Sequence, residues 1–224
     1  MKPSRSGAPS GSMHPGRLDV GGDLFRSADT CAAMWGLIPA AGRGTHIQPL
    51  AVAGFLVDRL IAGGATKLCF VINSNESDIL EYFGGSIQGI PICYVVQPRP
   101  AGVCDAIFRA LPLIFPDEPV AIGLPDTIWF PERALAELPS DDLSLLLFSV
   151  QHSWILGACK MPGGIMTELF QLWCDRDRRD ERFGTLVNAY LASGGCARAF
   201  PIGTDSVDVG TLGGWRHPPH ADVR

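Results

Sequence analysis

The sequence has few charged and few aromatic residues, and it has no long uninterrupted apolar run. Charged residues make up 18% of the 224 positions and aromatic residues 8%, whereas hydrophobic residues make up 46%. A chain of this composition is typical of a well-buried globular protein and not of a disordered one. No stretch approaches the roughly eighteen consecutive apolar residues of a transmembrane helix, so we expect no membrane span.

An excess of positive charge is also missing. The 18 Lys and Arg residues are outnumbered by 23 Asp and Glu residues, which gives a formal net charge of −5 at pH 7. This acidic balance argues against non-specific binding to nucleic acid or to an anionic membrane. A phosphate-bearing ligand would therefore need local cations or a metal ion.

The seven cysteines include no Cys-x-x-Cys pair, their number is odd, and their spacing is wide. Most of them lie in apolar strings, as Cys69 and Cys93 do. These features predict buried thiols in a reducing, cytoplasmic environment and do not support a zinc site.

The length suits one α/β domain with a substantial core. Residues 1–33 are rich in Ser, Gly and Pro and lack the apolar block of a signal peptide, so they are interpreted as a flexible leader. We expect a single domain over residues 34–214 and a frayed tail over residues 215–224.

From Trp35 onward, apolar runs alternate with amphipathic stretches. The runs predict buried strands at 35–40, 67–72, 90–97, 120–124 and 143–150, and the stretches between them predict helices at 52–62, 76–83 and 101–113. Continuous apolar strands alternating with helices indicate an α/β class, three-layer, Rossmann-like fold. Its central sheet would be mostly parallel, with helices on both faces.

The pattern is looser after residue 150. A strand is expected at 154–160, helices at 164–173 and 184–191, and two short strands at 197–201 and 206–209. The charged cluster at 175–182 is interpreted as a solvated loop.

A loop of small residues follows the first predicted strand. It comprises Ala40, Ala41, Gly42, Arg43, Gly44 and Thr45. Small side chains let a ligand approach the backbone, whose N–H groups can cradle phosphate oxygens. The loop is not a P-loop, because Gly44 is not followed by a Lys-Ser/Thr pair, and Ile47 stands where a dinucleotide fingerprint needs Gly or Ala. An ordinary tight turn between strand and helix is the alternative.

Two aspartates are candidate metal ligands. Asp126 directly follows a buried strand, where a carboxylate can hold Mg²⁺ or can instead cap a helix or stabilise a turn. Asp208 lies between two valines on a predicted strand, which is unfavourable unless it is paired, metal-bound or facing water.

Gln97 and Gly102 follow the third predicted strand. The Gln97 amide can donate and accept hydrogen bonds at the edge of a nucleobase, and Gly102 would leave room for the base. The alternative is a Pro-rich loop with an exposed glutamine. Since ligands of such sheets bind beyond the carboxyl ends of the strands, the glycine-rich loop, Gln97 and Asp126 are predicted to share one site.

Four motifs, in this order, resemble those of the sugar-1-phosphate nucleotidyltransferase family. The loop from Ala41 to Leu50 is similar to the family's Ala-Gly-x-Gly-Thr-Arg-Leu-x-Pro-Leu, and Gln97 to Ala106 is similar to Gln-Pro-x-Pro-x-Gly-x-Ala-x-Ala. Pro125 to Thr127 resembles the Gly-Asp-Asn metal turn, and Asp208 to Thr211 matches Asp-Val-Gly-Thr. The resemblance covers roughly residues 35–214.

The resemblance implies transfer of a nucleoside monophosphate from a nucleoside triphosphate, dTTP or UTP, to a sugar 1-phosphate. The products would be a nucleoside-diphosphate sugar and pyrophosphate. It also implies that Asp126 and Asp208 hold Mg²⁺ and serve the reaction together with Arg43. The implied nucleotide-binding residues are Ala40, Ala41, Gly42, Gly44, Thr45, Gln97 and Gly102. A homo-oligomer is left open.

The chain departs from the family where cations are needed. His46 stands where the family has Arg, and Leu50 runs directly into Ala51 without the segment that carries the family's lysine. The β-rich excursion that usually follows the equivalent of Val150, with its Glu-Lys pair, is also missing. Arg43 and Lys160 are candidate substitutes. The alternative function is therefore a catalytically impaired relative that binds nucleotide or nucleoside-diphosphate sugar as a regulatory module.

Overall fold

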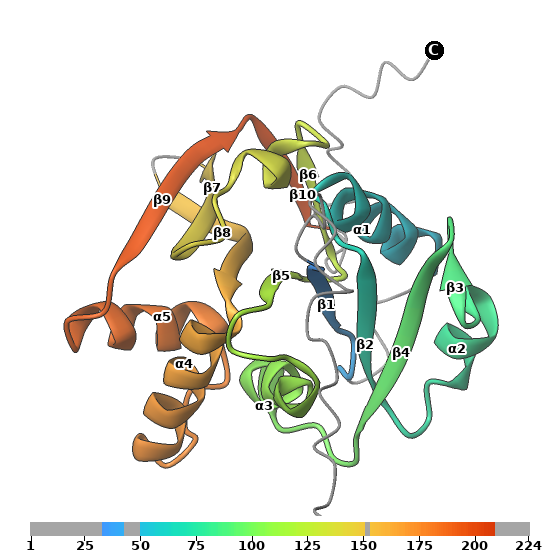
Figure 1. Ribbon diagram of the computed structural model, residues 1–224, viewed down its shortest axis with the longest axis horizontal. Coiled ribbons are helices and arrows are strands. Elements are labelled where there is room, and N and C mark those ends of the chain that lie inside the picture. Colours follow the sequence, from blue (N-terminus) through green and yellow to red (C-terminus); the bar gives the residue numbers. More distant parts are fainter. Residues whose placement is uncertain (1–32, 43–49, 151–152, 209–224) are drawn as a thin grey trace, which may run out of the picture. The chain divides into compact units, whose positions relative to one another are not determined.

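The computed structural model describes residues 33–42, 50–150 and 153–208 of the chain. The apolar runs form a sheet of eight strands in the order β3-β4-β2-β1-β5-β8-β7-β9 (Figure 1). Its strands are β1 (Trp35–Pro39), β2 (Lys67–Asn73), β3 (Ser86–Ile87), β4 (Ile90–Gln97), β5 (Pro119–Gly123), β7 (Leu143–Val150), β8 (Ser153–Pro162) and β9 (Ala197–Gly203). A separate antiparallel pair joins β6 (Thr127–Phe130) to β10 (Asp205–Asp208).

The strands β4, β2, β1 and β5 run parallel, as the alternation of strand and helix predicts. The strand β8 then lies antiparallel to both of its neighbours, β5 and β7, and β7 pairs in parallel with β9. Because β7 and β8 are joined by a short connection, they form a hairpin whose second strand inserts beside β5. The sheet is therefore mixed but mostly parallel.

Helices cover both faces of this sheet, which confirms the expected three-layer fold. The helices α1 (Leu50–Ala62) and α2 (Ser77–Phe83) pack on one face, where they share a core with Ile38, Phe70 and Phe148. The other face carries α3 (Gly102–Arg109), α4 (Gly163–Asp175) and α5 (Phe183–Ala192), packed on Leu37 and Val71. Neighbouring residues of one strand thus enter different cores, since side chains alternate between the faces of a sheet.

Two local features differ from the expectations. The expected helix over 101–113 ends at Arg109, and a 3₁₀ turn, Leu111–Leu113, follows, because Pro112 has no N–H to continue the helix. The strands β3 and β6 were not expected; both are short, and β6 pairs with a strand far away in the chain. The cluster at 175–182 is exposed as expected except at Asp180, which is buried and paired with Arg176 at 2.7 Å.

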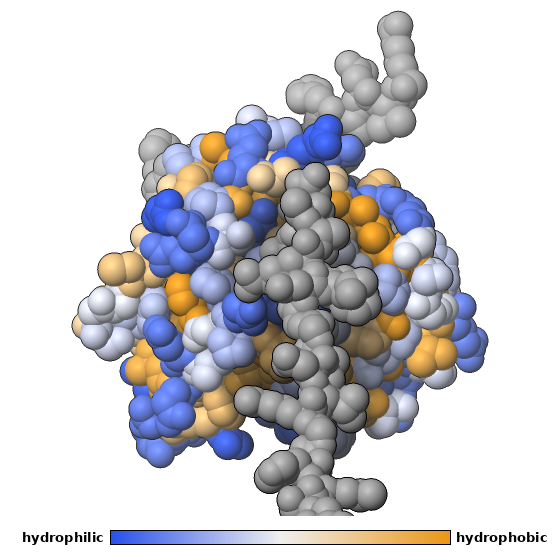
Figure 2. Space-filling view, viewed as in Figure 1, coloured by the Kyte–Doolittle hydropathy of each residue, from blue (hydrophilic) through white to orange (hydrophobic). Residues whose placement is uncertain are grey.

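The described surface is mixed in character. Large exposed apolar side chains such as Phe55, Tyr82 and Phe115 come from different elements, and Figure 2 shows apolar residues in several groups between polar ones. None of the helices within the described ranges combines the length and the apolar character needed to cross a membrane.

Two adjacent glycines begin α4 and differ in their surroundings. The Gly163 N–H donates to Glu118 O at 2.8 Å, and a Cβ on Gly163 would overlap the Phe115 carbonyl oxygen. A Cβ on Gly164 would meet only Pro116 O, at an ordinary 3.5 Å. The close approach of α4 to the segment before β5 therefore depends on Gly163.

We expect Gly163→Ala to lower the free energy of unfolding by about 1–3 kcal/mol, because the backbone at Phe115 must move. The matched variant Gly164→Ala should be neutral or stabilising by up to about 1 kcal/mol, since alanine favours the helix. Urea unfolding of both variants and the parent measures the difference. Equal midpoints for the two variants would contradict the proposed packing role.

Candidate functional site

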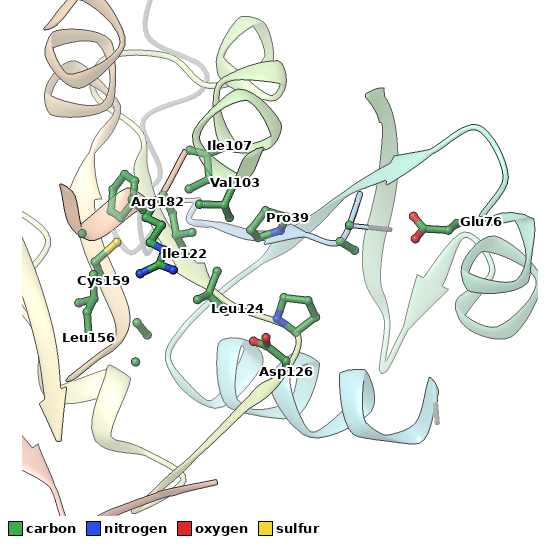
Figure 3. A pocket seen from close by; sticks show the side chains of 17 residues that line it. Pro39, Glu76, Val103, Ile107, Ile122, Leu124, Asp126, Leu156, Cys159 and Arg182 are labelled. Atoms are coloured by element: carbon green, nitrogen blue, oxygen red, sulfur yellow. The ribbon is translucent and has the colours of Figure 1, made fainter. Parts of the chain in front are cut away.

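A cavity of about 370 Å³ opens at the carboxyl ends of β1 and β5. The chain leaves these two parallel strands at Pro39 and Gly123, so the turns that follow both reach the same edge of the sheet. Such an edge is where ligands of open α/β sheets bind. Figure 3 shows the cavity walls, which come from the turns after β1 and β5, from α3, from β8 and from the start of α5.

The turn after β1 supplies one wall through Ala40 and Gly42. Ala40 and Ala41 are buried, and the Ala40 N–H donates to Val71 O at 2.7 Å, which extends the pairing of β1 with β2. The Gly42 carbonyl accepts a hydrogen bond of 3.0 Å from Asn73 Nδ2, at the end of β2. Arg43, Gly44 and Thr45 lie outside the described residues.

The turn between β5 and β6 brings Asp126 to the cavity (Figure 3). Its Oδ1 accepts a hydrogen bond of 3.2 Å from Thr127 Oγ1. The antiparallel register places Asp208 of β10 directly across from Thr127. The backbone thus brings the two aspartate positions together although they are far apart in the sequence.

The position of β6 depends on a buried arginine of α1. Arg59 Nε donates to Trp129 O at 2.7 Å, and its Nη1 donates to Phe55 O at 3.1 Å. Its guanidinium also lies 5.1 Å from the centre of the Phe130 ring. Burial lowers the pKa of Arg59, and the neighbouring Glu132 partly opposes this effect. Arg59 therefore connects α1 to the strand that follows Asp126.

Gln97 and Gly102 lie behind the cavity wall. Gln97 is 1% exposed, so it is not the exposed loop residue of the alternative interpretation. Its Nε2 donates to Asp105 Oδ2 at 2.6 Å and to Gly102 O at 3.3 Å. Gly102 has a φ of +88°, and a Cβ there would lie 3.0 Å from Glu181 Cα. Both residues fix the start of α3, which contributes Val103 and Ile107 to the cavity.

Glu76 lies at the cavity and was not singled out from the sequence, where it only marked the start of a helix. It is 7% exposed, and its Oε2 accepts a hydrogen bond of 2.9 Å from the Asn73 backbone N–H. Burial raises the pKa of Glu76, and this hydrogen bond partly opposes the rise. A buried carboxylate at a cavity is a feature of functional sites. The position of Glu76 shortly after the second predicted strand could have identified it as a candidate from the sequence.

Arg182 is the second residue that the sequence did not reveal. It lies in the charged cluster just before α5, and its exposed side chain lines the cavity (Figure 3). The fold brings it there because the Arg176–Asp180 pair and the hydrogen bond from Trp173 Nε1 to Asp180 O fix the preceding turn.

The expectation that Lys160 offsets the missing cations is not supported by its position. Lys160 is buried, and its Nζ lies 3.4 Å from Gly63 O, near the end of α1. Desolvation lowers the pKa of Lys160. Its neighbour Cys159 lines the cavity; Lys160 belongs to the opposite face of β8.

Within the described residues, no group of three or more His, Cys, Asp or Glu side chains could hold a metal ion. Mg²⁺ is commonly bound through only one or two carboxylates, with phosphate oxygens of the substrate completing its shell. The adjacent positions of Asp126 and Asp208 fit that requirement.

No family model matches the chain, and no curated protein matches it. Solved structures do share its fold. A protein assigned as a glucose-1-phosphate thymidylyltransferase from Bacillus anthracis, solved with sucrose, matches with a TM-score of 0.69 and 17% identity, over 83% of this chain and 93% of that one. A UDP-glucose pyrophosphorylase from Acinetobacter baumanii matches with a TM-score of 0.64 and 14% identity, over 82% and 91% of the two chains.

A third structure, a UDP-glucose pyrophosphorylase complexed with UDP-glucose, matches with a TM-score of 0.63 and 15% identity, over 82% of this chain and 96% of that one. Likeness at these identities establishes the fold. The expected fold is thus confirmed, and the names of these neighbours agree with the family that the four motifs resemble.

The buried carboxyl of Glu76 should make stability depend on pH. The pKa of Glu76 in the folded state is raised. The free energy of unfolding therefore falls as pH rises from the ordinary pKa of about 4.3 through the folded-state pKa. Glu76→Gln removes this loss. The free energy of unfolding of the variant, relative to that of the parent, should therefore rise from pH 4 to pH 7. Urea unfolding at both pH values tests this, with Glu81→Gln, an exposed position on α2, as the control. A difference that does not change with pH would contradict it.

Proposed function

We propose that this chain is a nucleotidyltransferase that transfers a nucleoside monophosphate from dTTP or UTP to a sugar 1-phosphate. The products are a nucleoside-diphosphate sugar and pyrophosphate. The observation that carries the proposal is the cavity at the carboxyl edge of the sheet, which is lined by the turn after β1 and by Asp126. The shared fold and the order of the four motifs support it.

The reaction is the attack of a sugar-phosphate oxygen on the α-phosphorus of the triphosphate, with pyrophosphate leaving. Phosphoryl transfer of this kind depends on positioning and charge neutralisation, so no protein nucleophile is required. Backbone N–H groups of the segment Ala41–Thr45 bind the phosphates in this proposal, since its small residues let the ligand come close. Ala40 lines the cavity, and its own N–H donates to Val71 O.

Asp126 and Asp208 are the residues that would hold Mg²⁺. When bound, the ion would neutralise charge on the phosphate oxygens. The pairing of β6 with β10 supports this assignment, because it places Asp208 across from the neighbour of Asp126. Arg59 contributes indirectly, since it anchors β6 at Trp129.

Gln97 and Gly102 serve the nucleotide by positioning the start of α3. The Gln97 amide is engaged with Asp105 and Gly102, and the start of α3 presents Val103 to the cavity. The nucleoside would therefore contact the surface that these two residues fix.

Arg182 supplies positive charge on the sugar-phosphate side. The family's lysines have no counterpart at the corresponding positions of this sequence, and Lys160 lies buried beside Gly63. An arginine fork can bind two phosphate oxygens at once. Arg43, outside the described residues, would act on the triphosphate side.

A second candidate is a regulatory module that binds nucleotide or nucleoside-diphosphate sugar without efficient turnover. The apolar character of many cavity-lining residues, among them Leu156, Ile122 and Phe183, favours this candidate. Fold likeness alone does not establish activity.

Pyrophosphate release separates the two candidates. The full-length protein is incubated with each nucleoside triphosphate, a panel of sugar 1-phosphates and Mg²⁺. Turnover with dTTP or UTP supports the enzyme. Absence of turnover with every pair, together with Mg²⁺-dependent nucleotide binding by calorimetry, favours the regulatory module.

We expect Asp126→Asn to abolish Mg²⁺-dependent pyrophosphate release, because the amide does not supply the negative charge that binds the ion. The fold should persist, as judged by circular dichroism. Asp117→Asn, at an exposed turn, is the control and should retain activity. Unchanged turnover in Asp126→Asn would refute the assigned role.

Arg182→Gln should lower kcat/KM for the sugar 1-phosphate by about tenfold to a hundredfold, as expected for loss of a charge-assisted hydrogen bond. The affinity for the nucleotide alone should change little. Arg198→Gln removes an arginine of β9 that pairs with Asp141, and it should leave both quantities unchanged. Equal kinetics for the parent and Arg182→Gln would contradict the role of Arg182.

A further inference from the structure

Two cysteines face each other across adjacent strands. Cys69 of β2 and Cys93 of β4 are register partners. Both pack into the core on the face that α3 covers, and both are free thiols. Neighbouring strands lie about 4.8 Å apart, and disulfides join Cα atoms that are about 4.4–6.8 Å apart. The backbone spacing therefore permits a bond between the two sulfurs.

The two thiols differ in access and in charge. Cys69 is buried, whereas Cys93 is partly exposed. A hydrogen bond with Cys69 lowers the pKa of Cys93 to about 7, and Lys67 contributes to this shift. The same hydrogen bond, together with burial, raises the pKa of Cys69. The accessible member of the pair is thus the one that carries thiolate character, and a protonated thiol lies beside it.

The charge of Lys67 is held beside this pair. Its Nζ lies 2.6 Å from Glu118 Oε1 and 4.4 Å from the centre of the Trp35 ring. Lys67 is two residues before Cys69 on β2, so both side chains leave the same face of the strand. Glu118 shares the Lys67 charge, and a lysine near a thiol is one of the features that mark reactive cysteines.

We propose that Cys93 and Cys69 form a peroxide-reactive dithiol that closes reversibly to a disulfide between β2 and β4. A hydroperoxide is the oxidant. The Cys93 thiolate attacks one peroxide oxygen, the O–O bond breaks, and Cys93 becomes a sulfenic acid. The other oxygen leaves as hydroxide or alkoxide and takes a proton from solvent to become water or an alcohol. The Cys69 sulfur then attacks the Cys93 sulfur, the S–O bond breaks, and the Cys69 proton leaves with the departing hydroxide as water. Two thiols are oxidised, and one peroxide is reduced.

This site is separate from the nucleotide cavity. Cys69 and Cys93 lie four positions before Asn73 and Gln97, which are the last residues of their strands. The distance along each strand is about 13 Å. The proposal therefore does not depend on the proposed nucleotidyltransferase activity.

The experiment treats the reduced full-length protein at pH 7 with hydrogen peroxide, alkylates the remaining thiols after set times, and maps the peptides by mass spectrometry without reduction. We expect a Cys69–Cys93 cross-linked peptide that disappears with dithiothreitol. Cys93 should be lost about tenfold faster than Cys196, since the hydrogen bond with Cys69 and the nearby Lys67 lower the pKa of Cys93 and so raise its thiolate fraction.

Cys196 is an informative internal reference because it is more exposed than Cys93. If exposure alone set the rates, Cys196 would react first, and this result would overturn the proposal. Absence of the cross-linked peptide while Cys93 is oxidised would overturn it as well.

Three variants complete the test. In Cys69→Ser the sulfenic acid on Cys93 should persist and be trapped by dimedone, whereas Cys93→Ser should abolish the fast phase. Cys104→Ser, a buried position on the same face whose thiol pKa is raised to about 12 by burial, should oxidise as the parent does. Should Cys93→Ser fail to fold, the peptide map of the parent protein decides the question by itself.

Discussion

The parallel hydrogen bonding of β4, β2, β1 and β5 is the constraint on which the rest of the structure depends. Parallel strands end at the same edge, so the turns after Pro39, Asn73 and Gly123 all emerge together. Helices cover both faces of these strands, so β1, β2 and β5 are buried, whereas β4 is partly exposed. This alignment places three features at one cavity, namely the turn at Gly42 and the carboxylates of Glu76 and Asp126.

The second half of the chain completes the site by pairings between distant segments. The antiparallel insertion of β8 beside β5 brings Cys159 to the cavity, and the pairing of β10 with β6 brings Asp208 beside Thr127. The turn before α5, held by Arg176 and Asp180, directs Arg182 into the same space. The cation that the sequence lacks near the glycine-rich loop is thus replaced, in our proposal, by one from a remote loop. Such compensation is possible because the cavity is bounded by segments from both halves.

Much of the fold was predictable because the strands are continuous apolar runs. The strands at 90–97 and 143–150 were predicted with the bounds that the structure has, and Asp126 was found at the cavity because it directly follows an apolar strand. Gln97 was placed at the correct edge, but its burial and its bond to Asp105 were not foreseen, because a Pro-rich neighbourhood ordinarily indicates an exposed loop. Glu76 and Arg182 escaped notice because their local sequences also fit a helix start and a solvated loop.

The sequence by itself determined the class of fold, the edge of the sheet at which the cavity opens, and the order of the four motifs, because strand burial and turn composition are local properties. Only the tertiary structure decided which charged residues reach the cavity. Lys160 and Arg182 are both cations in the second half of the chain, yet one lies beside Gly63 and the other lines the cavity. That difference depends on strand register and on the path of a loop, which are set by contacts between segments distant in the chain.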